Sequence, residues 1–373
     1  MASTTFSPGL EGVVAGETAV CEVTQTGLRY HGYDIADLAE NTCFDEVAHL
    51  LLHGALPRAD ELAAFRARVR AAMRLPDVVE RTLRSFPKAT PPMDVLRSAV
   101  SLLAHFDPDM DDNSAAAEQR KAERLLGQLA AVMGVWQQHA NGVEAYAADP
   151  EASHGANLLG MMLGRKPDDL SARVLDGTLI LYAEHDYNAS TFTARVIAST
   201  LSDLHGAVTG AIAALKGPLH GGANEAAMKM FQEIGSVDNV EPWFRSAIAA
   251  RKKIMGFGHR VYKHGDHRAR ILHDWSKQLS KQTGQTHWID MAEKLADLML
   301  REKNIHPNTD YPAAHAYYQM GIPIPLYTPI FVCSRITGWC AHILEQHGAN
   351  RLFRPLSQYS GPGLRSVPPV DQR

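Results

Sequence analysis

The sequence predicts an all-α fold that begins with a short N-terminal hairpin. From Phe44 onward, apolar residues recur at spacings of three and four, and Gly or Pro interrupts these runs where helices should begin or end. Strand-like segments are confined to Thr18 to Val23 and Leu28 to Tyr30, on either side of Thr-Gln-Thr-Gly. With 373 residues and 45% apolar content, the chain is long enough to bury a large helical core.

The helical spacing appears first in three consecutive segments. These are Val47, Leu50 and Leu51; Leu62, Phe65 and Val69; and Met93, Leu96, Val100 and Leu103. Two later segments, Ser190 to Leu215 and Tyr327 to Glu345, are apolar or small on most sides. Such segments are expected of helices buried within a larger helical body.

The predicted domain division follows from a change in composition. The stretch between Glu241 and Asn304 carries more charge than the buried segments that flank it. We therefore expect a small helical domain over residues 221–321, with limits near Gly221 and Gly321. Residues 1–220 and 322–373 then form the large helical domain.

Composition excludes several classes of partner. Lys and Arg number 37 against 41 Asp and Glu, a net charge of −4, so no global basic field attracts nucleic acid or an anionic membrane. The four cysteines show no C-x-x-C spacing, which favours a reducing cytoplasm over a disulfide framework. The chain shows neither a signal-peptide pattern nor a membrane span.

Three histidines lie where the backbone can approach a ligand. His185 stands between Glu184 and Asp186, while His220 and His259 follow or precede glycines. A lone histidine in such a place is most often a surface or capping residue. Three together favour a chemical role.

A metal site is the first alternative. His259, His264, Asp266 and His267 lie within nine positions. Their spacing is not H-E-x-x-H, and no second pair at helical i, i+4 spacing supports them. We therefore predict no metal.

The run from Gly217 to Asn224 has two interpretations. It could simply end one helix and begin the next. Its glycines also leave backbone N–H groups free at a helix N-terminus, where negative charge is stabilised. A histidine at this position, His220, is expected to be neutral and a hydrogen-bond donor.

Three arginines lie among apolar or small residues, where an unpaired cation is costly. They are Arg268, Arg335 and Arg354. Arg335 lies in a segment expected to be buried, so it needs either an internal carboxylate or a ligand carboxylate. The sequence leaves both possibilities open.

Taken in order, several motifs resemble the signatures of the citrate synthase family. They are Gly27-Leu-Arg-Tyr-His-Gly-Tyr-Asp-Ile, Pro92-Met-Asp-Val-Leu-Arg, Ala183-Glu-His-Asp-Tyr-Asn-Ala-Ser-Thr-Phe-Thr-Ala-Arg, Gly217-Pro-Leu-His-Gly-Gly-Ala-Asn-Glu, Gly256-Phe-Gly-His-Arg-Val-Tyr-Lys, Pro307-Asn-Thr-Asp and Asn350-Arg-Leu-Phe-Arg-Pro. The resemblance covers nearly the whole chain. Within the family it is greatest to bacterial 2-methylcitrate synthases, through Leu181-Tyr-Ala-Glu-His and Phe331-Val-Cys-Ser-Arg.

The resemblance implies an all-α homodimer whose small domain closes over the substrates, with no metal or redox cofactor. It implies that Asp310 removes the α-proton of a thioester and that His220 hydrogen-bonds the enolate oxygen. His259 would polarise the oxaloacetate carbonyl. An aspartate is a weak base in water, so exclusion of solvent on closure would strengthen it.

The same matching assigns binding residues for both substrates. His185, Arg268, Arg335 and Arg354 should hold oxaloacetate, with Arg354 reaching in from the partner subunit, so that the active site is shared. The CoA site should lie along Lys252, Lys253, Ile254, Met255 and Gly256, where cations and free amides suit phosphate. The alternative for the two lysines is a solvated helix end.

The expected reaction is the condensation of propionyl-CoA with oxaloacetate and water to 2-methylcitrate and CoA, with overlapping acetyl-CoA activity. Asp266-His267-Arg268 replaces the usual Asp-Pro-Arg, and His154-Gly-Ala-Asn157 replaces the Gly-Gly-His-Phe of methylcitrate synthases. These departures bear on substrate preference, so a citrate synthase proper is the alternative. A metal-dependent hydrolase and a non-catalytic helical scaffold are remoter alternatives.

Overall fold

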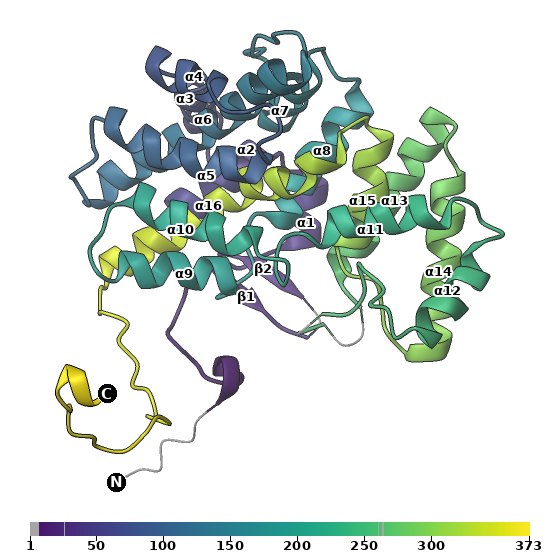
Figure 1. Cartoon of the computed structure of the whole chain (residues 1–373). Coiled ribbons are helices and arrows are strands. Elements are labelled where there is room, and N and C mark those ends of the chain that lie inside the picture. The colour runs from purple at the N-terminus through teal and green to yellow at the C-terminus, as the bar shows by residue number, and fades with distance from the viewer. Residues whose placement is uncertain (1–6, 26, 260, 263–264) are drawn as a thin grey trace.

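The computed structural model describes residues 7–25, 27–259, 261–262 and 265–373, and Figure 1 shows that the chain is almost entirely helical. The all-α prediction is confirmed. A small antiparallel sheet joins β1 (Cys21–Val23), β2 (Leu28–Tyr30) and β3 (Tyr33–Asp34). The predicted hairpin is therefore its first two strands, with Cys21 opposite Tyr30, and the third strand was not predicted. Thr26 of the connecting turn lies outside the described residues.

Sixteen α-helices follow the sheet in the described part of the chain. The first ten are α1 (Ile35–Asn41), α2 (Phe44–His53), α3 (Ala59–Ala71), α4 (Asp77–Arg84), α5 (Pro92–Leu103), α6 (Ala115–Asn141), α7 (His154–Leu163), α8 (Asp169–Tyr182), α9 (Ala189–Ala198) and α10 (Leu204–Lys216). The other six are α11 (Ala223–Ile234), α12 (Val240–Ala249), α13 (His267–Thr283), α14 (His287–Lys303), α15 (Asp310–Gln319) and α16 (Tyr327–Gly348). Short 3₁₀ turns are η1 (Pro8–Leu10), η2 (Ala104–Phe106), η3 (Ile324–Leu326) and η4 (Val370–Gln372).

The apolar segment from Ser190 to Leu215 holds two helices rather than one. The side chain of Asp203 accepts a hydrogen bond from the Gly206 N–H and so caps α10, separating it from α9. The two helices pack against each other, which explains why both are small or apolar on most sides.

The helix α16 forms the centre of the larger group of helices. It packs against α2, α5, α6, α8, α9 and α10, and nearly all of its residues are buried. Figure 1 shows it running through the middle of this group. Its burial all round agrees with the apolar character predicted for Tyr327 to Glu345.

The helices α11 to α15 gather at one side of the molecule (Figure 1). They pack mainly against one another, through α13 with α15, α11 with α15 and α12 with α14. Helices α11 to α15 contact the larger group of helices mainly through the packing of α13 against α8. The domain limits near Gly221 and Gly321 stay a prediction.

The C-terminal segment from residue 349 leaves the helical body (Figure 1). It has no regular structure before η4 and exposes the apolar side chains of Leu352, Leu356, Tyr359, Leu364, Val367 and Val370. Across the described residues, none of the helices combines the length and the apolar character that a membrane span requires.

Candidate active site

The predicted base, Asp310, is the first residue of α15. Its backbone N–H donates to Oδ1 of Asn308 at 3.1 Å, and its own Oδ1 accepts the phenol O–H of Tyr182 at 2.8 Å. Burial and the nearby Asp266 raise the pKa of Asp310 to about 6, although Tyr182 and Arg268 oppose this. A half-buried carboxyl with such a pKa is a stronger base than an ordinary aspartate and is still ionised at neutral pH.

His220 lies in the turn between α10 and α11 and faces the start of α9. Its Nε2 accepts the backbone N–H of Ser190 at 3.3 Å and lies 2.9 Å from Oγ of Ser190. Burial and the charge of Arg335 lower the pKa of His220 to about 4. The ring is therefore neutral, and with Nε2 accepting, the proton lies on Nδ1, which can donate to a ligand.

Two further histidines meet beside Tyr262. The rings of His185 and His259 are 5.0 Å apart, and His185 Nε2 lies 3.1 Å from the Tyr262 hydroxyl. Nδ1 of His259 accepts the backbone N–H groups of Val261 and Tyr262, at 3.1 and 3.3 Å. Burial, with Arg268 and His259, holds the pKa of His185 well below its usual value. Both rings therefore keep a fixed orientation.

Arg268 has an internal carboxylate partner. Its Nε and Nη2 donate to Oδ1 and Oδ2 of Asp266 at 3.0 and 2.8 Å, and both side chains are buried. Thr309, the residue before Asp310, donates its hydroxyl to the same Oδ2 at 2.8 Å. This pair therefore ties the start of α13 to the start of α15.

Arg335 is the contrasting case. Its side chain is buried on α16, its Nε donates to the Tyr182 carbonyl at 2.7 Å, and its guanidinium lies 4.7 Å from the Phe331 ring centre. No carboxylate in the described part of the chain forms an ion pair with it at salt-bridge distance. Burial lowers the pKa of Arg335, with Glu184 acting in the opposite direction. Such a buried cation favours an anionic ligand.

Aromatic side chains connect these groups into one site. The Tyr182 ring packs on Phe331 at 4.6 Å, and Phe331 also faces His220 at 6.4 Å. The charges of Arg268 and Arg335 act to lower the pKa of both His185 and Asp310. Six of the seven predicted catalytic and oxaloacetate residues therefore come together, namely His185, His220, His259, Arg268, Asp310 and Arg335.

The seventh, Arg354, lies elsewhere. It is exposed on the C-terminal segment and donates to the Pro355 carbonyl at 3.2 Å. Together with Phe353, Leu10 and Val13 it lines an open pocket beside α9. Within a single chain, this arginine does not reach the other six.

The predicted CoA segment divides into two parts. Lys252 pairs with Glu233 at 2.7 Å and packs over Trp243, while Lys253 is exposed, so neither lysine differs from a solvated helix end. Ile254 is buried. Met255 lines a cleft of about 710 Å³ that reaches Pro218, next to the His220 turn.

Gly256 begins a close pairing with the segment before the base. Its φ is +82°, and a Cβ there would meet Tyr311 Cβ at 2.9 Å. Its carbonyl accepts the Asn308 N–H at 2.9 Å, and Gly258 N–H donates to the His306 carbonyl at 2.9 Å. The loop thereby fixes the approach to Asp310.

Two residues of the site were missed as functional candidates, Tyr182 and Ser190. Both lie inside motifs that carried the resemblance, Leu181-Tyr-Ala-Glu-His and Asn-Ala-Ser-Thr-Phe. No sequence spacing identifies the Tyr182 phenol or the Ser190 hydroxyl as a functional group. Only the fold shows that they hold Asp310 and His220.

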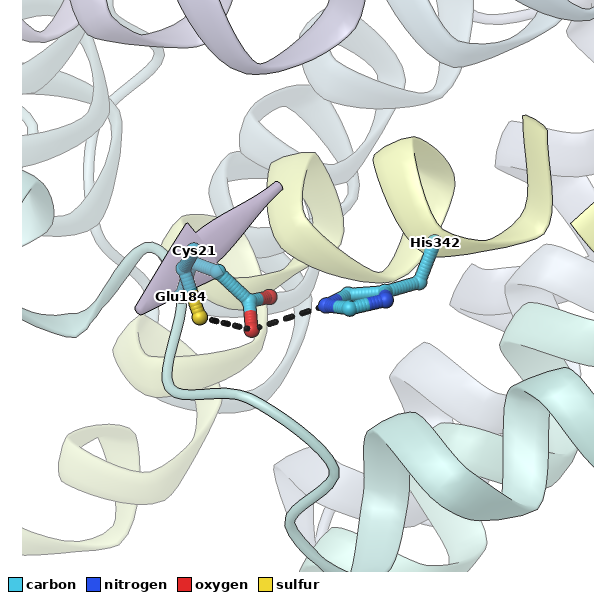
Figure 2. Close-up of side chains that lie close together, drawn as sticks. All are labelled: Cys21, Glu184 and His342. Carbon is cyan, nitrogen blue, oxygen red and sulfur yellow. Dashed lines mark hydrogen bonds and ion pairs between the residues drawn. The ribbon is translucent and has the colours of Figure 1, made fainter. Parts of the chain in front are cut away.

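Glu184, the residue before His185, belongs to a second cluster, and Figure 2 shows three of its members, Cys21, Glu184 and His342. His342 Nε2 lies 3.0 Å and Cys21 Sγ 3.5 Å from Oε1 of Glu184. On its other side, His342 Nδ1 lies 2.9 Å from the Arg195 guanidinium, which is paired with Glu345 at 2.5 Å. We refer to these five residues as the Glu184 cluster.

Among the described residues, Cys21, Glu184 and His342 are the one group of three possible metal ligands within 4.8 Å of one another. The guanidinium of Arg195 beside the same imidazole opposes a divalent cation there. Of the residues weighed for a metal from the sequence, His259, Asp266 and His267 are not in this group, and His264 lies outside the described residues.

Comparison with known proteins supports the same reading of the chain. A family model described as citrate synthase, C-terminal domain, matches residues 9–356. Citrate synthase 2 of Bacillus subtilis is 42% identical over 370 residues, 99% of this chain and 100% of that protein. A 2-methylcitrate synthase of Shewanella oneidensis is 42% identical over 368 residues, covering 98% and 97%.

A solved structure agrees over the whole fold. Citrate synthase from the archaeon Thermoplasma acidophilum, in a ternary complex with carboxymethyl coenzyme A and oxaloacetate, superimposes with a TM-score of 0.93. The sequences are 35% identical, and the match covers 99% of this chain and 100% of that one.

The fold and the relatives together define an acyltransferase. The chain belongs to the citrate synthase family. Its relatives of equal identity carry both names, citrate synthase and 2-methylcitrate synthase. The reaction class is therefore established separately from the choice of acyl group.

Proposed function

We propose that this enzyme condenses propionyl-CoA with oxaloacetate and water, giving 2-methylcitrate and CoA, and that it also uses acetyl-CoA. The observation that carries the proposal is one site that combines three groups: a base of raised pKa, Asp310; a neutral donor, His220; and a buried cation, Arg335, that no carboxylate of the described residues pairs with. A carbon acid, its enolate and a carboxylate substrate need these three functions.

The chemistry begins at the thioester. Asp310 takes the α-proton, and the electron pair of the broken C–H bond moves to the thioester oxygen as an enolate. Nδ1–H of His220 donates to that oxygen as charge develops. The enolate carbon then attacks the oxaloacetate ketone, polarised by His259, and the alkoxide that forms takes a proton to become the product hydroxyl. Water cleaves the resulting thioester to a carboxylate and CoA, and Asp310 releases its proton to solvent.

Oxaloacetate is proposed to lie against Arg335, Arg268 and His185. One charge pair at 4 Å contributes about 4 kcal/mol at an effective dielectric near 20. Arg335 supplies the largest share, because Arg268 already pairs with Asp266. The complex of the Thermoplasma relative with oxaloacetate and a CoA derivative supports substrates of this kind.

CoA is proposed to bind along the loop from Lys252 to Gly256, which leads into the cleft beside His220. In this proposal residues 221–321 move as the small domain and exclude water from the bound thioester. The four cysteines are all free, in keeping with the proposed reducing cytoplasm.

The proposed homodimer explains the position of Arg354. Its segment projects from the helical body with several exposed apolar side chains, which suits an arm that packs on a second copy of the chain. Arg354 would then complete the partner's oxaloacetate site. In its own chain, Arg354 donates to the Pro355 carbonyl instead.

Complementation tests the shared site. Arg354→Ala and His220→Ala chains, each inactive as homodimers, should regain activity when coexpressed, because one of the two sites in a mixed dimer keeps both residues. Mixed dimers without activity would place Arg354 in the site of its own chain, and an active Arg354→Ala homodimer would place it outside the reaction.

The first test of function is a CoA-release assay with oxaloacetate, comparing kcat/KM for propionyl-CoA and acetyl-CoA. A higher value for propionyl-CoA supports the proposal, and a higher value for acetyl-CoA makes the enzyme a citrate synthase proper. One methylene in an apolar pocket is worth about 1–3 kcal/mol, so both should turn over. No turnover with either, or loss of activity on adding a chelator, would overturn the mechanism.

A further inference from the structure

The phenol of Tyr182 has an unusual partner for a buried tyrosine. Tyr30 donates its O–H to the Ile180 and Glu184 carbonyls at 3.1 Å, and Tyr311 donates to the Ala292 carbonyl at 2.9 Å. Tyr182, only 3% exposed, donates instead to Oδ1 of Asp310. Its hydroxyl therefore meets the acid–base group itself rather than a helix carbonyl.

Three separate contacts fix the place of Tyr182. Its ring packs edge-on against Phe331 at 4.6 Å, and its own carbonyl accepts Nε of Arg335 at 2.7 Å. Its hydroxyl reaches from α8, in the proposed large domain, to α15, in the proposed small one. The same residue thus borders the proposed oxaloacetate cation and holds the proposed base.

We propose that Tyr182 is a positioning residue for the condensation, which occupies Oδ1 of Asp310 and leaves Oδ2 as the oxygen that receives the thioester α-proton. The proposal rests on the function proposed above. Donation of the O–H to a carboxylate orients it and favours its ionised form. The phenol keeps its own proton throughout, so no further acid or base is required.

The electrostatic setting of Asp310 defines what loss of the hydroxyl should do. The groups acting on this carboxyl are Tyr182 from α8, Arg268 and Asp266 from the start of α13, and Arg335 from α16. The negative charge of Asp310 in turn acts to raise the pKa of Tyr317 on the same helix. Tyr182→Phe removes one group that lowers the pKa of Asp310 and leaves the others in place.

Tyr182→Phe should therefore lower kcat by about 10-fold or more with either thioester, the usual cost of losing a hydrogen bond to a charged group. The acid limb of the kcat/KM profile should move to higher pH. KM for oxaloacetate should stay near the wild-type value, because Phe keeps the backbone carbonyl that holds Arg335. A purely structural role would lower the melting temperature without moving the acid limb.

Tyr311→Phe is the matched control. It also removes one buried tyrosine hydroxyl, next to Asp310 in the chain, but that hydroxyl points to Ala292. It should share any loss of stability and keep the wild-type acid limb. Equal shifts of the limb in both variants, or none in Tyr182→Phe, would overturn the proposal.

A measurement without substrate separates this inference from the proposed reaction. Carbon NMR of aspartate-labelled protein, with the Asp310 carboxyl assigned through Asp310→Asn, follows its titration directly. The pKa of Asp310 should be higher in Tyr182→Phe than in wild type and Tyr311→Phe. An unchanged pKa refutes the positioning role even if the enzyme turns over, whereas a raised pKa in an enzyme without turnover refutes only the reaction.

Discussion

Asp310 lies in the candidate active site and Glu184 in the neighbouring Glu184 cluster, and the surroundings of the two carboxyl groups shift their pKa values in opposite directions. Burial raises the pKa of Asp310 to about 6, because the carboxylate accepts a hydrogen bond from the neutral Tyr182 phenol and forms no ion pair within the described part of the chain. Burial also acts to raise the pKa of Glu184, yet His342 and Arg335 outweigh it and hold the pKa below its usual value. Burial alone therefore does not decide what a carboxylate does.

The hydrogen-bonding and ionic partners of each carboxylate determine its role. Glu184 is fully enclosed, ion-paired with His342 at 3.0 Å and seated in a hollow that Gly338 leaves in α16. Beyond His342, Arg195 and Glu345 form a further ion pair. An ion-paired carboxylate such as Glu184 holds a loop in place, whereas the charge of Asp310, which is not ion-paired among the described residues, is available to a substrate.

The largest expected effect is that of Asp310→Asn, which should remove the catalytic base and leave the fold intact. Asp310→Asn should lower CoA release by about 10³-fold, since general-base catalysis contributes about 10²–10⁴-fold. A carboxyl whose folded pKa is raised stabilises the fold less as pH rises from its ordinary pKa to about 6. The melting temperature at pH 8 should therefore be unchanged or higher, and calorimetry showing a large loss would instead make Asp310 a structural residue.

Glu184→Gln should show the reverse pattern of stability. Removing one member of a buried ion pair leaves His342 and its neighbours uncompensated, so the free energy of unfolding should fall by about 3 kcal/mol in denaturant titration at pH 7. The matched control is Glu22→Gln, which breaks the exposed pair with Arg29. That control should change stability by less than about 1 kcal/mol. Equal losses in both variants would mean that the buried ion pair of Glu184 contributes no more to the free energy of unfolding than an exposed pair.

The hollow in α16 can be filled without touching any charge. In Gly338→Ala, the new Cβ would lie 2.0 Å from Oε2 of Glu184 and 2.4 Å from the Ala183 carbonyl, so the loop that carries His185 must shift. We expect a loss of about 2 kcal/mol in unfolding free energy, as for overpacking elsewhere. Gly348→Ala, at the open end of the same helix, should be neutral or slightly stabilising. Similar results for the two would show that Glu184 does not depend on this hollow.

The smallest effect is the pH dependence of the reaction itself. Only the ionised form of Asp310 accepts a proton, so kcat/KM should fall to about half its plateau at the pKa of about 6. The rate should decline as pH falls, while thermal unfolding over the same range shows the fold intact. A flat profile down to pH 5 would assign Asp310 an ordinary pKa.

Much of this organisation could be predicted from the sequence. The helical spacing gave the fold class, and the motifs assembled six residues that the structure does bring together. The sequence could not decide between an internal and a ligand carboxylate for Arg268 and Arg335. In the structure the two arginines differ. Arg268 has an internal carboxylate partner, because Asp266 lies two residues away and reaches its guanidinium.

Other features depended on contacts that no local pattern marks. Glu184 and His342 are 158 residues apart, and Tyr182 and Asp310 are 128 apart, so their pairing is a property of the packed helices. The third strand has two residues, too few for an alternating pattern. Asp203 lies inside the apolar segment from Ser190 to Leu215, and the backbone turn that makes it the N-cap of α10 is visible only in the structure.

The position of α16 also bears on how the chain is made. Six helices of the large group, from α2 to α10, pack on a helix that begins only at Tyr327. During synthesis those six emerge from the ribosome without the surface that covers them, and domains generally fold as units. The core of the large group is therefore completed only after α16 has been translated, and until then the apolar faces of the six helices lack the surface that covers them.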